Sequence, residues 1–484
     1  MSARVPAAGD RDRGDAGWML CSAGGCEGVT GSAHLLRCGD DRVLVDAGLF
    51  QGVDEESGND APWPFDPREL TAVVLTHGHL DHVGRLPRLV ADGFRGPVLA
   101  TSATLAVAEV VLRDAARIQQ EDAARARRRL RRAGRDPERV RPAYREADVA
   151  AALALARPAR FHQPLRVGRR LRVELGPAGH VLGAAWALLT GPTDRVLVSG
   201  DLGDTDGPLH PPPAPPPPTD ALLIEATYGD RRHRTWQATL TEFAEVVGRT
   251  LRRGGNVLLP SFALERTQTV LYALQTLERD GRLPTARVVL DAPMASRMTA
   301  LYRRFPATLR PDIAARLAFG DDPFRPARLE LARSGEASRA LNQARGVIIV
   351  AGAGMMTGGR ILHHLKHHLW DARNAVVVVG YQAEGTLGRR LVDGAQRVRL
   401  LGETIAVAAE VHTVNGFSAH ADAPALDAWW QASGARVLVP VHGETGARRA
   451  LAQRAAAAGI QVRSARVGEA LSLRLSGEDR GAAS

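Results

Sequence analysis

Short apolar runs that end in polar residues dominate the first part of the chain. Residues 42–47 (RVLVDA) and 71–76 (TAVVLT) each predict a buried strand, and Asp46 and Thr76 stand where these strands end. Loops at strand ends often carry the chemistry of a protein. A helical pattern over 103–133 predicts a long helix after the second run. Further strands are expected at 170–175, 184–190 and 195–199.

The pattern changes after about residue 229, where long helical stretches alternate with single apolar runs. Such alternation is typical of a doubly wound parallel sheet, whose strands are buried on both faces. The predicted strands are 256–260, 287–290, 346–350 and 374–380. Short strands return near the end, most clearly at 435–441. We therefore expect an α/β domain made of residues 1–228 and 412–484, with a second α/β domain, 229–411, inserted into it.

Composition and charge narrow the class of protein. The 484 residues carry 63 Lys and Arg against 53 Asp and Glu, a formal net charge of +10, and 45% of them are hydrophobic, as in a globular protein. The positive charge suggests an anionic partner, with nucleic acid first in line. An arginine bias of the genome is the alternative, because Lys366 is the one lysine. The basic second half of helix 103–133 predicts a solvated helix face, with a phosphate contact as the alternative.

Targeting and redox signals point to the cytoplasm. No apolar run approaches the roughly 18 residues of a membrane-spanning helix, and the first residues lack the apolar core of a signal peptide. Three cysteines in so long a chain cannot form a disulfide framework. We expect a soluble cytoplasmic protein with no membrane partner.

The segment THGHLDH, residues 76–82, carries the strongest chemical signal. It places three imidazoles and a carboxylate within six residues, directly after a predicted strand. Zinc and similar metals prefer these ligands. In an extended loop His77 and His79 share a side, while Asp81 and His82 turn toward a second position. One short loop can therefore serve two ions, and we favour this over a polar loop with chance histidines.

This segment resembles the His-x-His-x-Asp-His motif of the metallo-β-lactamase superfamily, whose fold is a four-layered αββα sandwich. The resemblance implies further metal ligands after later strands. His180, after the strand at 170–175, and Asp201, after the strand at 195–199, match those positions. It also implies that Asp46 lies behind the ligand loop and holds it in place.

Three later segments resemble the additional motifs of the β-CASP branch of this superfamily. They contain Glu225 in LLIEATYGD, His420 in NGFSAHAD and His442 in VPVHGE. The stretch between them corresponds to the inserted β-CASP domain, and PSFALERTQ, LDAPMA and GAGMMTGGRILHHL match the same branch. The resemblance runs from about Gly17 to residue 470. It is closest to nucleases related to the cleavage-and-polyadenylation endonuclease subunit and to their bacterial counterparts.

The resemblance implies two zinc ions that hydrolyse a phosphodiester bond of single-stranded RNA. His420, made more basic by Glu225, is the expected proton donor to the leaving 3′ oxygen. Endonuclease action is expected, with 5′ exonuclease action as an addition, and homodimers are common among such relatives. The expected ligands are His77, His79 and His180 for one ion, Asp81, His82 and His442 for the other, and Asp201 as the bridge.

Contacts to the RNA backbone are expected from segments that the branch shares. The candidates are Ser418, Arg266 and the loop-to-helix junction of Gly358, Gly359 and Arg360. Structural roles are the alternatives: a turn for Ser418, a cover over the domain interface for Arg266, and close helix packing for the glycines.

Four histidines at 363, 364, 367 and 368 recur at helical spacing. A further metal site is conceivable there, but we favour an exposed or phosphate-facing helix.

Other functions remain as alternatives. A β-CASP nuclease that processes DNA shares the same core. A small-molecule metallo-hydrolase does not require so large an insertion over its site. A non-catalytic scaffold predicts lost ligands, whereas all seven expected metal positions are present.

Overall fold

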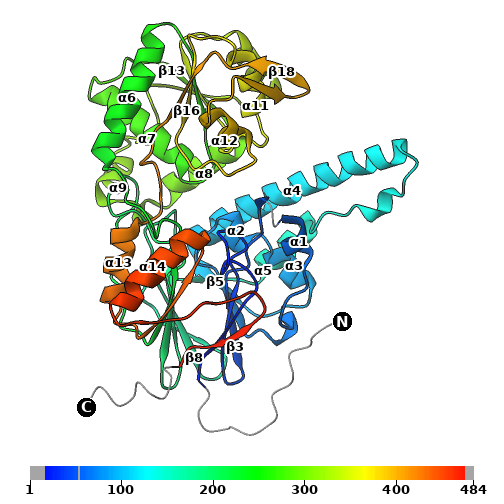
Figure 1. Cartoon of the computed structure of the whole chain (residues 1–484), viewed down its shortest axis with the longest axis vertical. Coiled ribbons are helices and arrows are strands. Elements are labelled where there is room, and N and C mark those ends of the chain that lie inside the picture. Colours follow the sequence, from blue (N-terminus) through cyan, green and yellow to red (C-terminus); the bar gives the residue numbers. More distant parts are fainter. Residues whose placement is uncertain (1–16, 53–54, 475–484) are drawn as a thin grey trace.

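The computed structural model of the chain describes residues 17–52 and 55–474. Figure 1 shows two parts, a lower part built around two large sheets and an upper part built around a third sheet. Helix α4 (Ser102–Arg132) runs from between the two parts and extends away from them.

Two seven-stranded sheets of the described residues form the centre of the lower part. The first has the order β22 (Ala470–Ser472), β1 (Met19–Ser22), β2 (His34–Cys38), β3 (Asp41–Val45), β4 (Ala72–Val74), β5 (Val98–Thr101) and β6 (Ala156–Ala159). The second has the order β21 (Gln461–Val462), β20 (Val437–Val441), β11 (Ala221–Glu225), β10 (Arg195–Val198), β9 (Ala185–Thr190), β8 (Leu171–Pro177) and β7 (Leu165–Val167). Val45 and Val74 of the first sheet share a buried cluster with Val198 and Val439 of the second, so the sheets pack face to face.

Helices cover the outer face of each sheet. Leu44 of the first sheet packs in one cluster with Leu89 and Leu112 of its helices, and Leu222 of the second sheet packs with Trp430. The result is the four-layered αββα sandwich that the family resemblance implies. The helices of this part, besides α4, are α1 (Glu55–Asp60), α2 (Leu80–Val83), α3 (Leu86–Ala91), α5 (Glu146–Ala154), α13 (Ala423–Ala432) and α14 (Thr445–Ala457).

The upper part is a six-stranded sheet whose strand pairs are all parallel, which confirms the predicted doubly wound arrangement. Its order is β14 (Arg328–Leu331), β13 (Arg287–Asp291), β15 (Val347–Ala351), β12 (Val257–Pro260), β16 (Ala375–Val378) and β19 (Glu410–Thr413). One face packs on α6 (Trp236–Arg252) and α7 (Arg266–Arg279), and the other packs on α11 (Ile361–His368) and α12 (Leu387–Val392). Other α-helices of this part are α8 (Pro293–Arg304), α9 (Pro311–Ala318) and α10 (Gly335–Ala340), and β17 (Arg397–Leu400) and β18 (Glu403–Ala406) form a hairpin.

The predicted elements match these closely. The helix expected at 103–133 is α4, and each predicted apolar run forms a strand whose limits lie within two residues of the expected ones. Position 411, where the sequence predicts the end of the inserted domain, falls inside β19. Among the described residues, no helix is both long enough and apolar enough to cross a membrane.

Candidate metal centre

The loop after β4 carries the predicted metal-binding segment, and Asp46 holds this loop from behind. The Asp46 carboxylate accepts hydrogen bonds from the backbone amide of Thr76 at 2.7 Å and from its hydroxyl at 2.8 Å. It also lies 2.7 Å from Nδ1 of His82, and all three residues are buried. A proton on Nδ1 of His82 leaves Nε2 free to bind a metal, so Asp46 fixes both the loop and the orientation of the ring.

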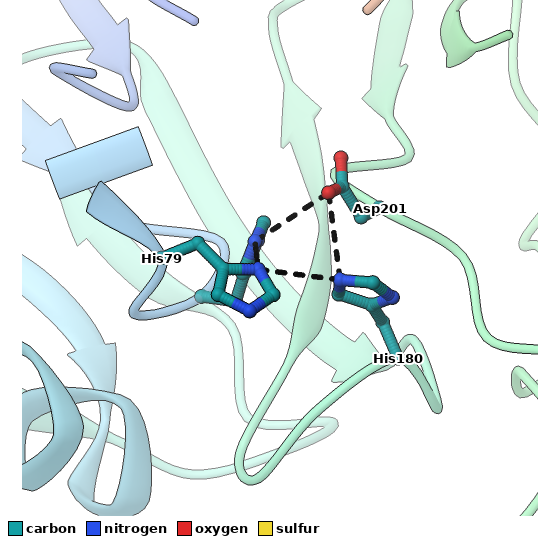
Figure 2. A group of neighbouring side chains, drawn as sticks. His79, His180 and Asp201 are labelled. Carbon is teal, nitrogen blue, oxygen red and sulfur yellow. Dashed lines mark hydrogen bonds and ion pairs between the residues drawn. The ribbon is translucent and has the colours of Figure 1, made fainter. Parts of the chain in front are cut away.

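His77, His79, His180 and Asp201 form a first group of ligand-type atoms, all within 4.8 Å of one another. Figure 2 shows the rings of His79 and His180 converging on the Asp201 carboxylate. Oδ2 of Asp201 lies 3.5 Å from Nε2 of both His77 and His180. Burial lowers the pKa of His79 to about 4 and that of His77 and His180 well below the usual value. The rings are therefore neutral near pH 7, as metal ligands must be.

Asp81, His82 and His442 form a second group. Nε2 of His442 lies 3.1 Å from Nε2 of His82 and 3.5 Å from the Asp81 carboxylate. Burial would raise the pKa of Asp81, but the hydrogen bond to His442 and the neighbouring charge of His82 lower it to about 2. Burial opposes a charge on His82, yet the carboxylates of Asp201 and Asp46 raise its pKa well above the usual value. A metal bound here would displace that proton.

Asp201 lies between the two groups. Its Oδ2 faces the first group, and its Oδ1 lies 3.5 Å from Nε2 of His82 and 3.6 Å from Nδ1 of His442. Oδ1 is buried and has no hydrogen-bond partner among the described residues. A buried carboxylate oxygen without a donor is costly unless a cation completes its surroundings. The imidazole and carboxylate donors suit zinc, so the residues fit two such ions with Asp201 shared.

Glu225 and His420 form a third group with Asp201, whose Oδ2 lies 3.9 Å from Nδ1 of His420. Nδ1 of His420 lies 3.2 Å from Oε1 of Glu225, which also accepts a hydrogen bond from the Leu202 amide at 2.8 Å. Glu225 is fully buried, whereas the His420 side chain is 20% exposed. Burial opposes the charged form of His420, but the Glu225 carboxylate raises its pKa above the usual value. His420 can therefore hold a proton and donate it to a bound group.

Parallel strand pairing explains why distant residues meet here. β11 pairs in parallel with β10 and with β20, so residues after these strands gather at one edge of the second sheet. Asp201, Glu225 and His442 all lie there. Gly200 allows the chain to turn toward the first sheet, because its φ is +55° and a Cβ would lie 2.7 Å from Cβ of Thr76.

The predicted RNA-contact residues are engaged with protein groups. The Ser418 hydroxyl accepts a hydrogen bond from the His420 amide at 3.2 Å. Arg266 donates to the carbonyl oxygens of Val379, at 2.7 Å, and of Phe417. The Ser418 contact fits the turn role given above as an alternative. The Arg266 contacts reach two residues of one buried cluster of the upper part, and the interface role and the phosphate contacts stay predictions.

The junction of loop and α11 has similar internal contacts. Arg360 donates to the Asp291 carboxylate and, at 2.8 Å, to the Ala332 carbonyl oxygen. Gly359 has a φ of +75°, and a Cβ there would lie 2.4 Å from the Gly352 carbonyl oxygen, whereas Gly358 is open. Gly359 thus serves close backbone packing.

The expectation of an exposed histidine helix at 363–368 is wrong for two of its members. His364 and His368 are buried, because their spacing places them on the side of α11 that faces the core beside Leu365. Nε2 of His364 lies 2.7 Å from Oδ2 of Asp291, and Nε2 of His368 donates to the Leu341 carbonyl oxygen at 3.1 Å. None of the candidate metal groups found in the described chain contains these histidines.

Sequence reasoning also missed Thr227. Its hydroxyl donates to the carbonyl oxygen of His442 at 3.1 Å and lies 3.1 Å from Nδ1 of the same residue. Nδ1 is thereby held as the donor, and Nε2 faces Asp81 and His82. The sequence offered one indication of this role, because Thr227 stands two residues after Glu225.

Three family models match successive parts of the chain. Residues 27–246 match the metallo-beta-lactamase superfamily, and residues 267–391 match the Beta-Casp domain. Residues 404–465 match the Zn-dependent metallo-hydrolase RNA specificity domain.

Curated relatives agree with these matches, and one solved structure shares the fold. "Ribonuclease TTHA0252" of Thermus thermophilus is 45% identical over 447 residues, which cover 92% of this chain and 98% of the relative. "Transcription termination factor FttA" of Methanosarcina mazei is 31% identical over 426 residues, and the match spans 84% of this chain and 63% of that longer protein. A protein of unknown function from Enterococcus faecalis has a similar fold, with a TM-score of 0.54 at 14% identity over 95% of this chain and 100% of that one.

Proposed function

This chain belongs to the β-CASP branch of the metallo-β-lactamase superfamily, and from that premise we propose a zinc-dependent ribonuclease that cuts single-stranded RNA with two metal ions. We propose endonuclease action, with 5′ exonuclease action on free ends. The observation that carries the proposal is the Asp201 carboxylate between two groups of histidine and aspartate ligands, next to the Glu225–His420 pair. The similarity to a ribonuclease over nearly the whole chain supports RNA as the substrate.

Two ions would be held by the two groups described above, with Asp201 shared between them. When bound, such ions supply a hydroxide near neutral pH and neutralise charge on the phosphoryl oxygens. The protein contributes orientation: Asp46 fixes the His82 ring and Thr227 fixes the His442 ring.

His420 completes the reaction as the general acid. Water attacks the phosphorus atom, the bond from phosphorus to the 3′ oxygen breaks, and protonated His420 gives a proton to that oxygen. Glu225 keeps His420 protonated and orients its ring through Nδ1. The products are a 5′ phosphate and a 3′ hydroxyl.

A substrate panel tests the proposal. Zinc-loaded protein is incubated with end-labelled single-stranded RNA, with the same sequence as DNA, and with a lactam. We expect cleavage of RNA above all, and loss of cleavage in His82→Ala and His420→Ala. His162→Ala, which removes an exposed histidine of the same sandwich, is the control and should match the parent. Equal rates for the parent and the two site variants contradict the proposal, and preferred cleavage of DNA assigns the DNA-processing alternative.

Location and assembly belong to the same proposal. We place the protein in the cytoplasm, where its cysteines stay reduced, and burial raises the pKa of the Cys26 thiol to about 11, which makes it unreactive. A homodimer stays a prediction of the family resemblance, and analytical ultracentrifugation tests it.

A further inference from the structure

Helix α4 supports the metal-binding loops with its first half only. Val107 is buried against the loop after β4. A Cβ added to Gly78 in that loop would lie 2.4 Å from Cγ1 of Val107. The hydroxyls of Thr101 and Thr104 donate to the Gly183 carbonyl oxygen, at 2.8 and 2.9 Å, in the loop that carries His180. Beyond Ala123, its last buried residue, the helix continues away from the rest of the molecule (Figure 1).

The projecting segment is strongly basic. Residues 125–141, which we call the basic arm, contain nine arginines and two acidic residues, a surplus of seven in a chain whose net charge is +10. Arginines of the first half of α4 are paired, as Arg113 is with Glu109 and Arg117 with Asp114. In the part of the chain that the structure describes, six arginines of the arm are exposed and have no ion pair: Arg128, Arg129, Arg131, Arg132, Arg135 and Arg141.

We propose that the basic arm is a second RNA-binding surface, which holds backbone phosphates of the strand whose cleavage site lies at the metal centre. The inference rests on the proposed function. From Val107 to Arg131 the helix rises about 36 Å. Helix α4 contains no glycine or proline at which it could kink, so it keeps the basic arm about 36 Å from the ligand loop.

The composition of the arm favours phosphates over other partners. The arm has no Phe, Trp or Tyr on which a base could stack, so its binding is independent of RNA sequence. A helix that lies on a lipid surface needs an apolar face. Leu130 and Val140 are the large aliphatic side chains here, and both are half-buried within the arm.

Two RNA lengths test the arm. The variant Arg128→Gln/Arg129→Gln/Arg131→Gln/Arg132→Gln removes four charges and keeps good helix formers. The control replaces four exposed arginines of the upper part by glutamine: Arg325, Arg328, Arg333 and Arg339. KM is measured with single-stranded RNAs of about 6 and about 30 nucleotides, of which the first covers one binding site and the second reaches further.

In the arm variant, the ratio of the KM for the long RNA to the KM for the short RNA should rise about tenfold. The slope of the logarithm of the binding constant against the logarithm of the salt concentration should become shallower by about 3, because four phosphate contacts are lost. The control should keep the parent ratio. An equal ratio in both variants overturns the proposal. Fluorescence anisotropy measures binding of the long RNA and needs no cleavage. If no RNA is cleaved, the proposed function is contradicted, and the anisotropy of parent and arm variant still tests whether the basic arm binds RNA. Weakened binding to phosphatidylserine vesicles with unchanged RNA binding assigns a membrane instead.

Discussion

Asp201 lies between both groups of ligand-type atoms. Its two oxygens face opposite groups, and Oδ1 has no hydrogen-bond partner among the described residues. Asp201→Asn keeps the shape and removes the charge that two cations would share. We expect zinc content below two ions per chain and cleavage reduced more than about a hundredfold. Elemental analysis together with the cleavage rate measures both. A variant with full zinc content and parental activity contradicts the shared-ligand role.

Glu225 controls the protonation of His420. The carboxylate raises the pKa of His420, so the acid is present below that raised pKa and is lost as pH rises through it. Glu225→Gln removes the charge and lowers the pKa of His420, so the alkaline decline of kcat/KM should move to lower pH. His420→Ala should lower the rate about 10²–10⁴-fold with zinc content unchanged. A pH profile of Glu225→Gln that matches the parent on its alkaline side excludes this role for the pair.

Every residue in the three clusters of ligand-type atoms was predicted from the sequence as a site residue. Metal-ligand chemistry restricts residue type and spacing, which makes those positions visible. Thr227 was missed because a threonine that orients a histidine has no distinctive pattern. His364 was misassigned because helical spacing alone does not tell which side of α11 faces the core.

The packing of Gly48 against the ligand loop gives a prediction about elements. A Cβ on Gly48 would lie 1.5 Å from the carbonyl oxygen of Asp81, so the loop must move to admit any side chain. Gly48→Ala should destabilise the fold by about 1–3 kcal/mol and reduce zinc binding. Gly28→Ala, where a Cβ meets nothing within 4 Å, is the control. Thermal melting and zinc titration compare the two, and equal behaviour contradicts the close packing.

Strands were predictable because buried runs leave a continuous apolar pattern, as at 374–380 and 435–441. Their neighbours were not. β20 pairs with β11 across more than 200 residues of chain, and β15 inserts between β13 and β12. These pairings depend on how the elements pack in three dimensions. The apolar pattern of one strand does not indicate which other strand it pairs with.

At the scale of the whole molecule, a buried network joins the lower and upper parts. Nδ1 of His210 lies 3.0 Å from the Thr308 carbonyl oxygen and Nε2 lies 2.9 Å from Glu265, which also accepts from the Tyr302 hydroxyl. Both ring nitrogens face acceptors, which favours the doubly protonated ring. Burial opposes that charge, but Glu265 raises the pKa of His210 above its usual value.

This network predicts a pH-dependent contribution to stability. Because the folded pKa of His210 is raised, its pairing with Glu265 stabilises the fold below the unfolded pKa, and this contribution is lost as pH rises through the folded pKa. Glu265→Gln should therefore lower Tm more at about pH 6 than at about pH 9. Melting curves give the difference in Tm between parent and variant at each pH. Because both proteins contain the same metal site, pH effects on that site cancel in this difference. A constant difference contradicts a charged His210.

We propose that water hydrolyses RNA at the metal centre, and the position of the new oxygen in the products tests this reaction. Zinc-loaded protein cleaves a defined single-stranded RNA in water enriched in the heavy isotope of oxygen, and mass spectrometry analyses the fragments. We predict internal fragments with a 3′ hydroxyl and with one heavy oxygen in each new 5′ phosphate. Fragments with a cyclic or 3′ phosphate and an unlabelled 5′ end, or intact RNA, contradict the account.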